Sequence, residues 1–165
     1  MKNIIKIILS LVMCFFLWGC QNQTEPNRTS TTQTQDHQET VEQDVTSKES
    51  KKISVTSNGQ ITIFELNDSQ AANSLYEQLP LTIEVENYSD NEKIFYPPVD
   101  LTMTDAVSAN AVTGTLAYYE PWTNVVMFYE DFGSASGLYE LGQAISGSEY
   151  IEDMSGTIEI EAYLE

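Results

Sequence analysis

The C-terminal part of the chain, residues 53–165, contains no arginine, no histidine and no cysteine, and its one basic side chain is Lys93. Ser-His-Asp triads, Cys-His pairs and zinc centres need histidine or cysteine, so these sites are excluded here. Nucleic acid is excluded as a partner, because phosphate binding needs clustered Lys and Arg. Without cysteine, no disulfide holds this region together, and its core must stabilise it alone.

Acidic side chains far outnumber basic ones. The chain has 25 Asp and Glu against 7 Lys and Arg, a formal net charge of −18. Residues 53–165 hold 19 of the acids and one base, so this region alone accounts for −18 and residues 1–52 are neutral overall. We expect a solvated acidic exterior, which keeps the domain soluble and repels it from anionic lipid.

The N-terminus has the pattern of an export signal. Lys2 and Lys6 precede an apolar run over 7–18, which is too short to span a bilayer as a helix. The following Leu17-Trp18-Gly19-Cys20 resembles a bacterial lipobox. This resemblance implies that 1–19 are a lipoprotein signal peptide and that Cys20 carries the lipid, including an acyl chain such as palmitate. The protein would then be lipid-anchored on the extracytoplasmic face of the cell membrane. A plain secretory signal and a retained membrane anchor are the alternatives.

Residues 20–52 predict a disordered polar tether. Between Gln21 and Lys51 the chain is Gln, Thr, Ser, Asn and charged residues, with little that is apolar except Val41 and Val45. Such a segment cannot bury enough surface to offset its ordering entropy. His37, the one histidine of the chain, lies here, and we expect it to be solvated rather than a metal ligand.

Residues 53–165 predict a mainly β domain with two short helices. Alternating residues on both sides of Asn58-Gly59 indicate a hairpin over 53–66. A polar N-cap cluster precedes a helix that runs to Leu79 and stops at Pro80. Residues 148–154 predict one or two further helical turns, and residues 99–113 have no clear pattern. Other strands are expected at 81–86, 93–96, 115–120, 124–129, 138–144 and 157–164. Many short strands with few helices favour a closed barrel.

An ordered series of features connects this region to a known family. The series comprises Asn58-Gly59, Leu79-Pro80-Leu81, Glu92-Lys93, Gly114–Tyr119, Pro121-Trp122, Phe128-Tyr129 and Leu141-Gly142. It resembles the bacterial cyclophilin-like domain family, which is often found on lipoproteins. The resemblance implies the cyclophilin fold over residues 53–165: a closed, mainly antiparallel eight-stranded β-barrel capped by two helices.

The resemblance does not extend to the catalytic group. Cyclophilins isomerise X-Pro bonds with an arginine that stabilises the twisted amide. A register on Pro97 puts Ile94 at that position, and Lys93, the only cation of the domain, lacks the planar guanidinium fork. We therefore assign no catalytic residue and expect a non-catalytic binding or accessory domain. The alternatives are an exported peptidyl-prolyl isomerase or foldase lacking the usual Arg, and an envelope protein whose acidic face meets a basic partner or wall-bound cations.

The aromatic side chains of this region allow two interpretations. They either fill the barrel core and its rim, or some line a groove at the position of the cyclophilin peptide site. The candidate groove residues are Phe95, Tyr96, Tyr118, Trp122, Phe128 and Tyr129. The expected partners are the membrane, through lipidated Cys20, and a peptide or envelope protein. No cofactor or dedicated metal site is expected, although exposed carboxylates allow weak calcium binding.

Overall fold

The computed structural model describes residues 50–164. The predicted signal peptide, Cys20 and the tether up to residue 49 lie outside the described residues. Within 50–164, no helix is both long and apolar enough to cross a membrane. Every strand pairing and every buried core residue of the described part lies within residues 52–162, so a fragment that contains these residues carries all the contacts its barrel needs.

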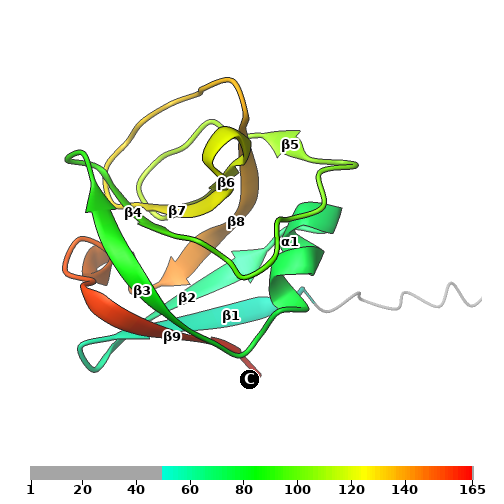
Figure 1. The fold of residues 1–165 in the computed structure, drawn as a ribbon. Helices are drawn as coiled ribbons and strands as arrows, with labels where there is room; N and C mark the ends of the chain where they lie inside the picture. Colours follow the sequence, from blue (N-terminus) through cyan, green and yellow to red (C-terminus); the bar gives the residue numbers. More distant parts are fainter. Residues whose placement is uncertain (1–49, 165) are drawn as a thin grey trace, which may run out of the picture. The chain divides into compact units, whose positions relative to one another are not determined.

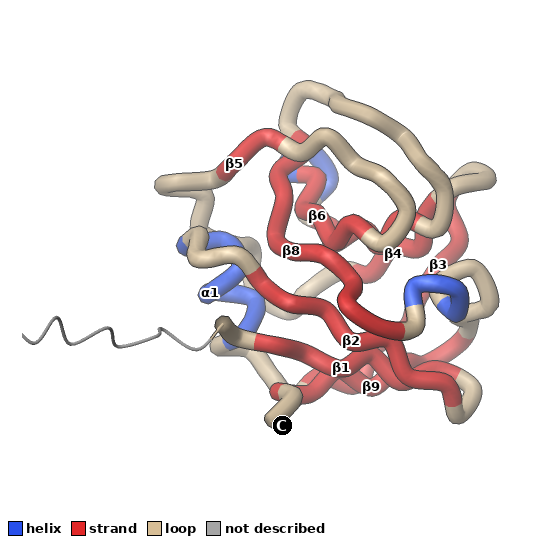
Figure 2. The backbone as a smooth tube through the Cα atoms, turned by 180° about the vertical axis from the view of Figure 1, so that it is seen from behind, coloured by secondary structure: helices blue, strands red, loops and turns tan. Residues whose placement is uncertain are grey.

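Eight antiparallel strands close into a barrel, as the sequence predicted (Figure 1). The ring runs β2-β1-β9-β3-β4-β7-β6-β8, and a pairing between β2 and β8 closes it. The short β5 pairs with β8 but is not part of the ring. Figure 2, from behind, shows β8 running from its pairing with β5 to its pairing with β2. The strands are β1 (Lys52–Ser57), β2 (Gln60–Leu66), β3 (Leu81–Tyr88), β4 (Glu92–Phe95), β5 (Val107–Ser108), β6 (Thr115–Tyr119), β7 (Asn124–Phe128), β8 (Leu138–Ser146) and β9 (Gly156–Ala162).

The predicted N-terminal hairpin is confirmed. Ser57 pairs with Gln60, so the β1–β2 loop has two residues, Asn58 and Gly59. Their φ angles of 53° and 78° are those of the hairpin turn that matches strand twist. Asparagine and glycine tolerate this left-handed conformation best, which is why the Asn-Gly pair places the turn.

Helix α1 (Gln70–Tyr76) begins as predicted and ends earlier. The Ser69 side chain caps it by accepting a hydrogen bond from the Ala72 backbone N–H at 3.1 Å. The predicted end was Leu79, but the N–H groups of 78 and 79 bond three residues back instead of four. The Gln78 side-chain amide contacts the loop after β4 (Glu92–Phe95), where its Oε1 accepts a hydrogen bond from the Val99 N–H at 3.0 Å. The last three predicted residues therefore form tight turns.

The one or two helical turns predicted at 148–154 are present, as 3-10 rather than α-helical turns. The segment contains only a 3-10 turn, η2 (Ser148–Tyr150), followed by further three-residue turns. Gly147 precedes it at φ 74°, and no side chain caps it. A Cβ on Gly147 would lie 2.3 Å from the Ile61 carbonyl oxygen, so the turn is fixed by close contact with β2. One α-helix is therefore present in the described residues.

The barrel wall has apolar side chains on both faces. The interior cluster includes Phe64, Leu75, Phe95, Tyr118 and Met127. A second, smaller cluster lies on the outer face of β4, β7 and β6, beneath the loops that cross it. Its members are Ile94, Ala109, Ala111, Ala117, Val126, Phe128 and Leu138. Since these two clusters use alternate residues of the same strands, they share the wall but face opposite sides.

Candidate functional site: an aromatic pocket on the outer wall

The outer face of β3, β4 and β7 carries one row of the site. The sheet register pairs Tyr88 of β3 with Glu92 of β4, and Glu92 with Phe128 of β7. Residues opposite one another in a sheet direct their side chains to the same face. An acidic side chain is therefore flanked by two aromatic ones on the outside of the barrel.

A second row lies further along the same face. Asn124, at the start of β7, pairs with Tyr119 of β6, and Tyr119 pairs with Leu138 of β8. Asn124 and Phe128 have the same parity in β7, with Val126 between them, so the two rows share a face. The region between the rows is floored by the Val126 side chain.

Two connections form the walls of this site. The 3-10 turn η1 (Glu120–Trp122) joins β6 to β7 and carries Trp122, whose ring meets Tyr88 and Tyr119 edge-on at centroid distances of 5.1 and 5.5 Å. The loop after β7 carries Phe132, which stacks on Phe128 at 5.4 Å. That loop is held to residue 111 by reciprocal backbone hydrogen bonds of 2.7 and 2.8 Å with Gly133. The walls are therefore anchored aromatic side chains.

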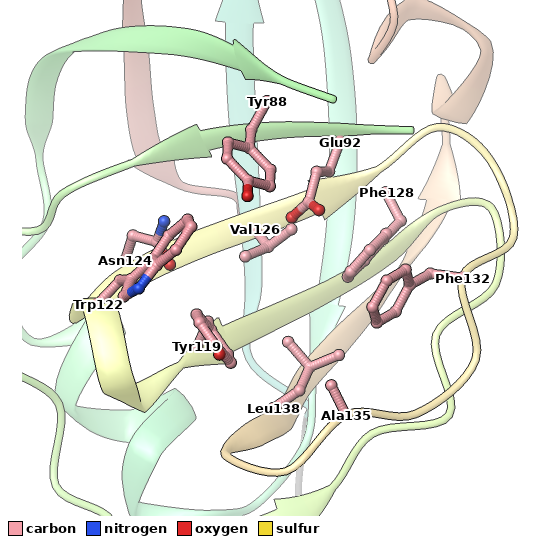
Figure 3. Close-up of a pocket in the computed structure, with 10 residues that line it drawn as sticks. All are labelled: Tyr88, Glu92, Tyr119, Trp122, Asn124, Val126, Phe128, Phe132, Ala135 and Leu138. Atoms are coloured by element: carbon pink, nitrogen blue, oxygen red, sulfur yellow. The ribbon is translucent and has the colours of Figure 1, made fainter. Parts of the chain in front are cut away.

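Together the rows and walls enclose a pocket of about 240 Å³, open on one side. Three of its aromatic rings stay partly exposed at the rim, at 43% for Tyr88, 45% for Trp122 and 47% for Phe132. Figure 3 shows the side chains that converge on it. They are Tyr88, Glu92, Tyr119, Trp122, Asn124, Val126, Phe128, Phe132, Ala135 and Leu138.

Glu92 is the one carboxyl group among the lining residues. Its carboxylate points into the space bordered by Tyr88, Val126 and Phe128 (Figure 3). Burial against these apolar surfaces raises the pKa of Glu92 above its ordinary value. Among the described residues, no salt bridge or hydrogen bond gives this carboxylate a cationic partner, and a positive group in the pocket would supply one.

Asn124 is the most deeply buried polar residue of the pocket wall. The residue is 1% exposed, and its side-chain Oδ1 accepts no hydrogen bond from any described residue. A buried amide oxygen without a donor costs about 1–3 kcal/mol. The wall of the pocket therefore carries an unsatisfied oxygen.

The predicted groove residues separate into three places. Trp122 and Phe128 line the pocket. Phe95 and Tyr118 face the barrel interior, each 1% exposed, and the Tyr118 hydroxyl accepts a hydrogen bond from the Leu101 N–H at 3.4 Å. Burial raises the pKa of this hydroxyl.

Tyr96 and Tyr129 occupy positions away from the pocket. Tyr96 is 47% exposed and follows the end of β4. Tyr129 packs against the interior cluster, and its hydroxyl lies 3.1 Å from Oδ1 of Asn87, to which it donates a hydrogen bond. The structure thus brings together two of the six predicted groove aromatics and disperses the other four.

Lys93 also lies away from the pocket. It is 8% exposed and follows Glu92 in β4, so its side chain faces the opposite side of the wall. Its Nζ lies 5.8 Å from the centroid of the Tyr129 ring, a cation–π contact at the interior side. Ile94, at the position expected for the cyclophilin arginine, does face the outer side and is buried in the outer cluster.

The pocket contains several residues that the sequence prediction did not select: Tyr88, Glu92, Tyr119, Asn124, Val126, Phe132, Ala135 and Leu138. One sequence signal was available: Asn124, Val126 and Phe128 are alternate residues of a single strand, so they share a face. The contributions of Tyr88 and Phe132 depend on pairing and loop anchoring, which no local pattern specifies. Among the described residues, no group of three or more His, Cys, Asp or Glu is placed to hold a metal ion.

Comparisons with known proteins agree with this architecture. A search of curated proteins found no match. The solution structure of the hypothetical protein AF2241 from Archaeoglobus fulgidus is similar, with a TM-score of 0.57 and 16% sequence identity, covering 69% of this chain and 95% of that one. At that identity the likeness shows the fold alone. Residues 55–162 match the sequence model of the Cyclophilin-like family, and the chain therefore belongs to the Cyclophilin-like family.

Proposed function

We propose that this protein is an exported lipoprotein, held on the membrane through Cys20, whose cyclophilin-like domain binds peptide segments without isomerising them. The polar tether over residues 20–52 would hold the domain off the bilayer. The domain's net charge of −18 would keep the domain from lying on anionic lipid. The domain would then act as a binding or accessory module at the cell envelope.

The observation that carries the proposal is the character of the pocket. It has apolar and aromatic walls of the kind that hold a side chain, yet none of its lining residues is Lys or Arg. An isomerase of the cyclophilin type needs a cation to stabilise the twisted amide. At the expected position stands Ile94, and the nearest cation in sequence, Lys93, faces the other side of the wall.

Two measurements on the fragment 45–165 test the domain's role. The first is a coupled isomerisation assay on Ala-Pro-Phe-type peptides, in which we expect no rate increase at micromolar protein. The second is peptide binding, followed by the fluorescence of Trp122, the one tryptophan of this fragment. An acceleration that the fragment alone provides would refute the non-catalytic role.

A matched pair of variants localises the binding. Ala135→Phe places a ring in the half-buried pocket wall, whereas Ala162→Phe makes the same change at an exposed end of β9. We expect only Ala135→Phe to abolish the fluorescence response. Equal binding by both variants would place the peptide elsewhere on the domain.

The anchoring is tested separately, on the full chain in a bacterial host. Mass spectrometry of the membrane-fraction protein should find a diacylglyceryl group on Cys20 as the first residue. A Cys20→Ser variant should be recovered in soluble form or with its signal uncleaved. An unmodified Cys20 in the mature protein would refute the lipoprotein assignment and leave the binding role of the domain unaffected.

A further inference from the structure

The one charged group of the pocket is negative. The Glu92 carboxylate points into it, and the unpaired Asn124 Oδ1 lies in its wall. The faces of aromatic rings carry negative quadrupole charge, and five of the ten lining residues are Tyr, Trp or Phe. No lining residue is Lys, Arg or His, so no cation in the wall neutralises the Glu92 charge.

The cations of the described residues lie at other places. Lys51 donates to Oδ1 of Asn73 at 2.8 Å and sits 4.9 Å over the Tyr76 ring, next to α1. Lys93 faces the interior side of the wall. Lys52 begins β1 and is not among the pocket residues. The negative potential of the pocket is therefore available to a ligand.

We propose that the pocket receives a lysine or arginine side chain of an extended peptide segment. This inference rests on the proposed peptide-binding function and names the residue that is recognised. The apolar floor would cover the methylene stem, the Glu92 carboxylate would pair with the charged head, and the Trp122 indole would supply a cation–π face.

The size and shape of the pocket favour one side chain of a longer chain over a larger ligand. A volume of about 240 Å³ holds a single long side chain, and falls below the range of about 300–1,000 Å³ for drug-sized ligands. The exposed rings of Tyr88, Trp122 and Phe132 extend the contact surface around the opening. This rim gives the residues that flank the inserted side chain an amphipathic surface to contact.

The charge of the whole domain acts in the same direction. Residues 53–165 carry −18, which attracts basic segments from solution and raises their association rate. A cation next to Glu92 also offsets the burial that raises the pKa of this carboxyl, and so favours its ionised form. General attraction and local pairing can be separated, because only the second depends on Glu92.

The experiment uses the fragment 45–165 and five-residue capped peptides that differ at the central residue. Lysine, arginine and norleucine are compared, norleucine keeping the stem of lysine without its charge, and butylamine serves as a free amine. Binding is followed by Trp122 fluorescence and by calorimetry. Glu92→Gln removes the pocket charge, and Glu159→Gln removes one exposed charge from β9 as the matched control.

We expect the lysine and arginine peptides to bind about tenfold or more tightly than the norleucine peptide. Glu92→Gln should abolish this difference, and Glu159→Gln should preserve it. Equal binding of the norleucine peptide overturns the inference while the peptide-binding function stands. Equal effects of the two variants, or butylamine binding as tightly as the lysine peptide, also overturn it. Absence of binding by every peptide refutes the proposed function itself.

Discussion

Replacing Asn124 by leucine should make the protein more stable. Asn124 is 1% exposed, and its Oδ1 has no donor among the described residues. Leucine keeps the branching at Cγ and has no polar group to desolvate. It also suits a strand in which all the other residues, Val125 through Phe128, are buried and apolar. The larger methyl groups can extend into the adjoining pocket of about 240 Å³ without overpacking the wall.

The expected gain follows from the orphaned oxygen. An unsatisfied buried polar group costs about 1–3 kcal/mol, and Asn124→Leu should recover that amount. For a domain of this size the gain corresponds to a rise in Tm of about 4 °C per kcal/mol. The same change places methyl groups in the pocket and removes the amide dipole, so we expect weaker peptide binding alongside the higher stability.

The assay is urea unfolding of the fragment 45–165, with Asn67→Leu as the control. The Asn67 amide donates to the Glu140 carbonyl at 2.7 Å, and its Oδ1 accepts hydrogen bonds from the Ser69 N–H at 3.1 Å and hydroxyl at 2.6 Å. The same substitution there should cost about 1.5 kcal/mol or more, because three hydrogen bonds are lost. If Asn124→Leu also destabilises the fragment by about 1 kcal/mol, the Asn124 amide is paired and the reasoning is refuted.

Three further predictions concern the wall and its charges. Glu92→Gln should stabilise the fragment, relative to wild type, increasingly as pH rises from about 4 to 7. Because the folded-state pKa of Glu92 is raised, its stability contribution in wild type is complete below the unfolded-state pKa and is lost as pH rises through the folded-state pKa. Glutamine does not titrate, so the variant has no such contribution to lose. Parallel urea curves across this range would contradict it. Gly142→Ala should lower the free energy of unfolding in urea by about 1–3 kcal/mol or more, because its Cβ would lie 2.2 Å from the Glu65 carbonyl oxygen at the β2–β8 closure. The control, Gly59→Ala, meets no atom within 4 Å and should lose only about 1 kcal/mol, for its positive φ. A smaller loss at 142 than at 59 would be inconsistent with this closure. Lys93→Met should leave the Trp122 fluorescence titration unchanged, because the lysine faces the interior side; lost binding would place it at the pocket.

The elements that the sequence predicted well are those with one covered face or a demanding turn. The hairpin at Asn58-Gly59 follows from a conformation that few residues adopt. In β3 the alternation of Leu81, Ile83 and Val85 with polar residues is clear, because only one face of this strand is covered. Such segments reveal both their type and their orientation.

The site could not be predicted in the same way, because its central strands, β4 and β7, are covered on both faces. In β7 all five residues are buried, and in β4 the last three are. Periodicity then disappears, and nothing local assigns Phe95 to the interior and Ile94 to the outside. The cover consists of residues 109–111, which belong to the stretch without a clear sequence pattern, and of the loop that carries Phe132 and Ala135. The faces of the aromatics were therefore set by distant loop segments.

The charge of the domain has a different meaning once the faces of β4 are known. The missing arginine and histidine only excluded functions: nucleic-acid binding, histidine-dependent catalytic and zinc sites, and a conventional isomerase. In the structure, Glu92 points into the pocket while Lys93 faces the other side. A carboxylate repels the carbonyl oxygen of a bound X-Pro amide and attracts an ammonium or guanidinium group. The same face that cannot stabilise a twisted amide is therefore suited to recognising a basic side chain, and the lysine-against-norleucine comparison decides whether it does.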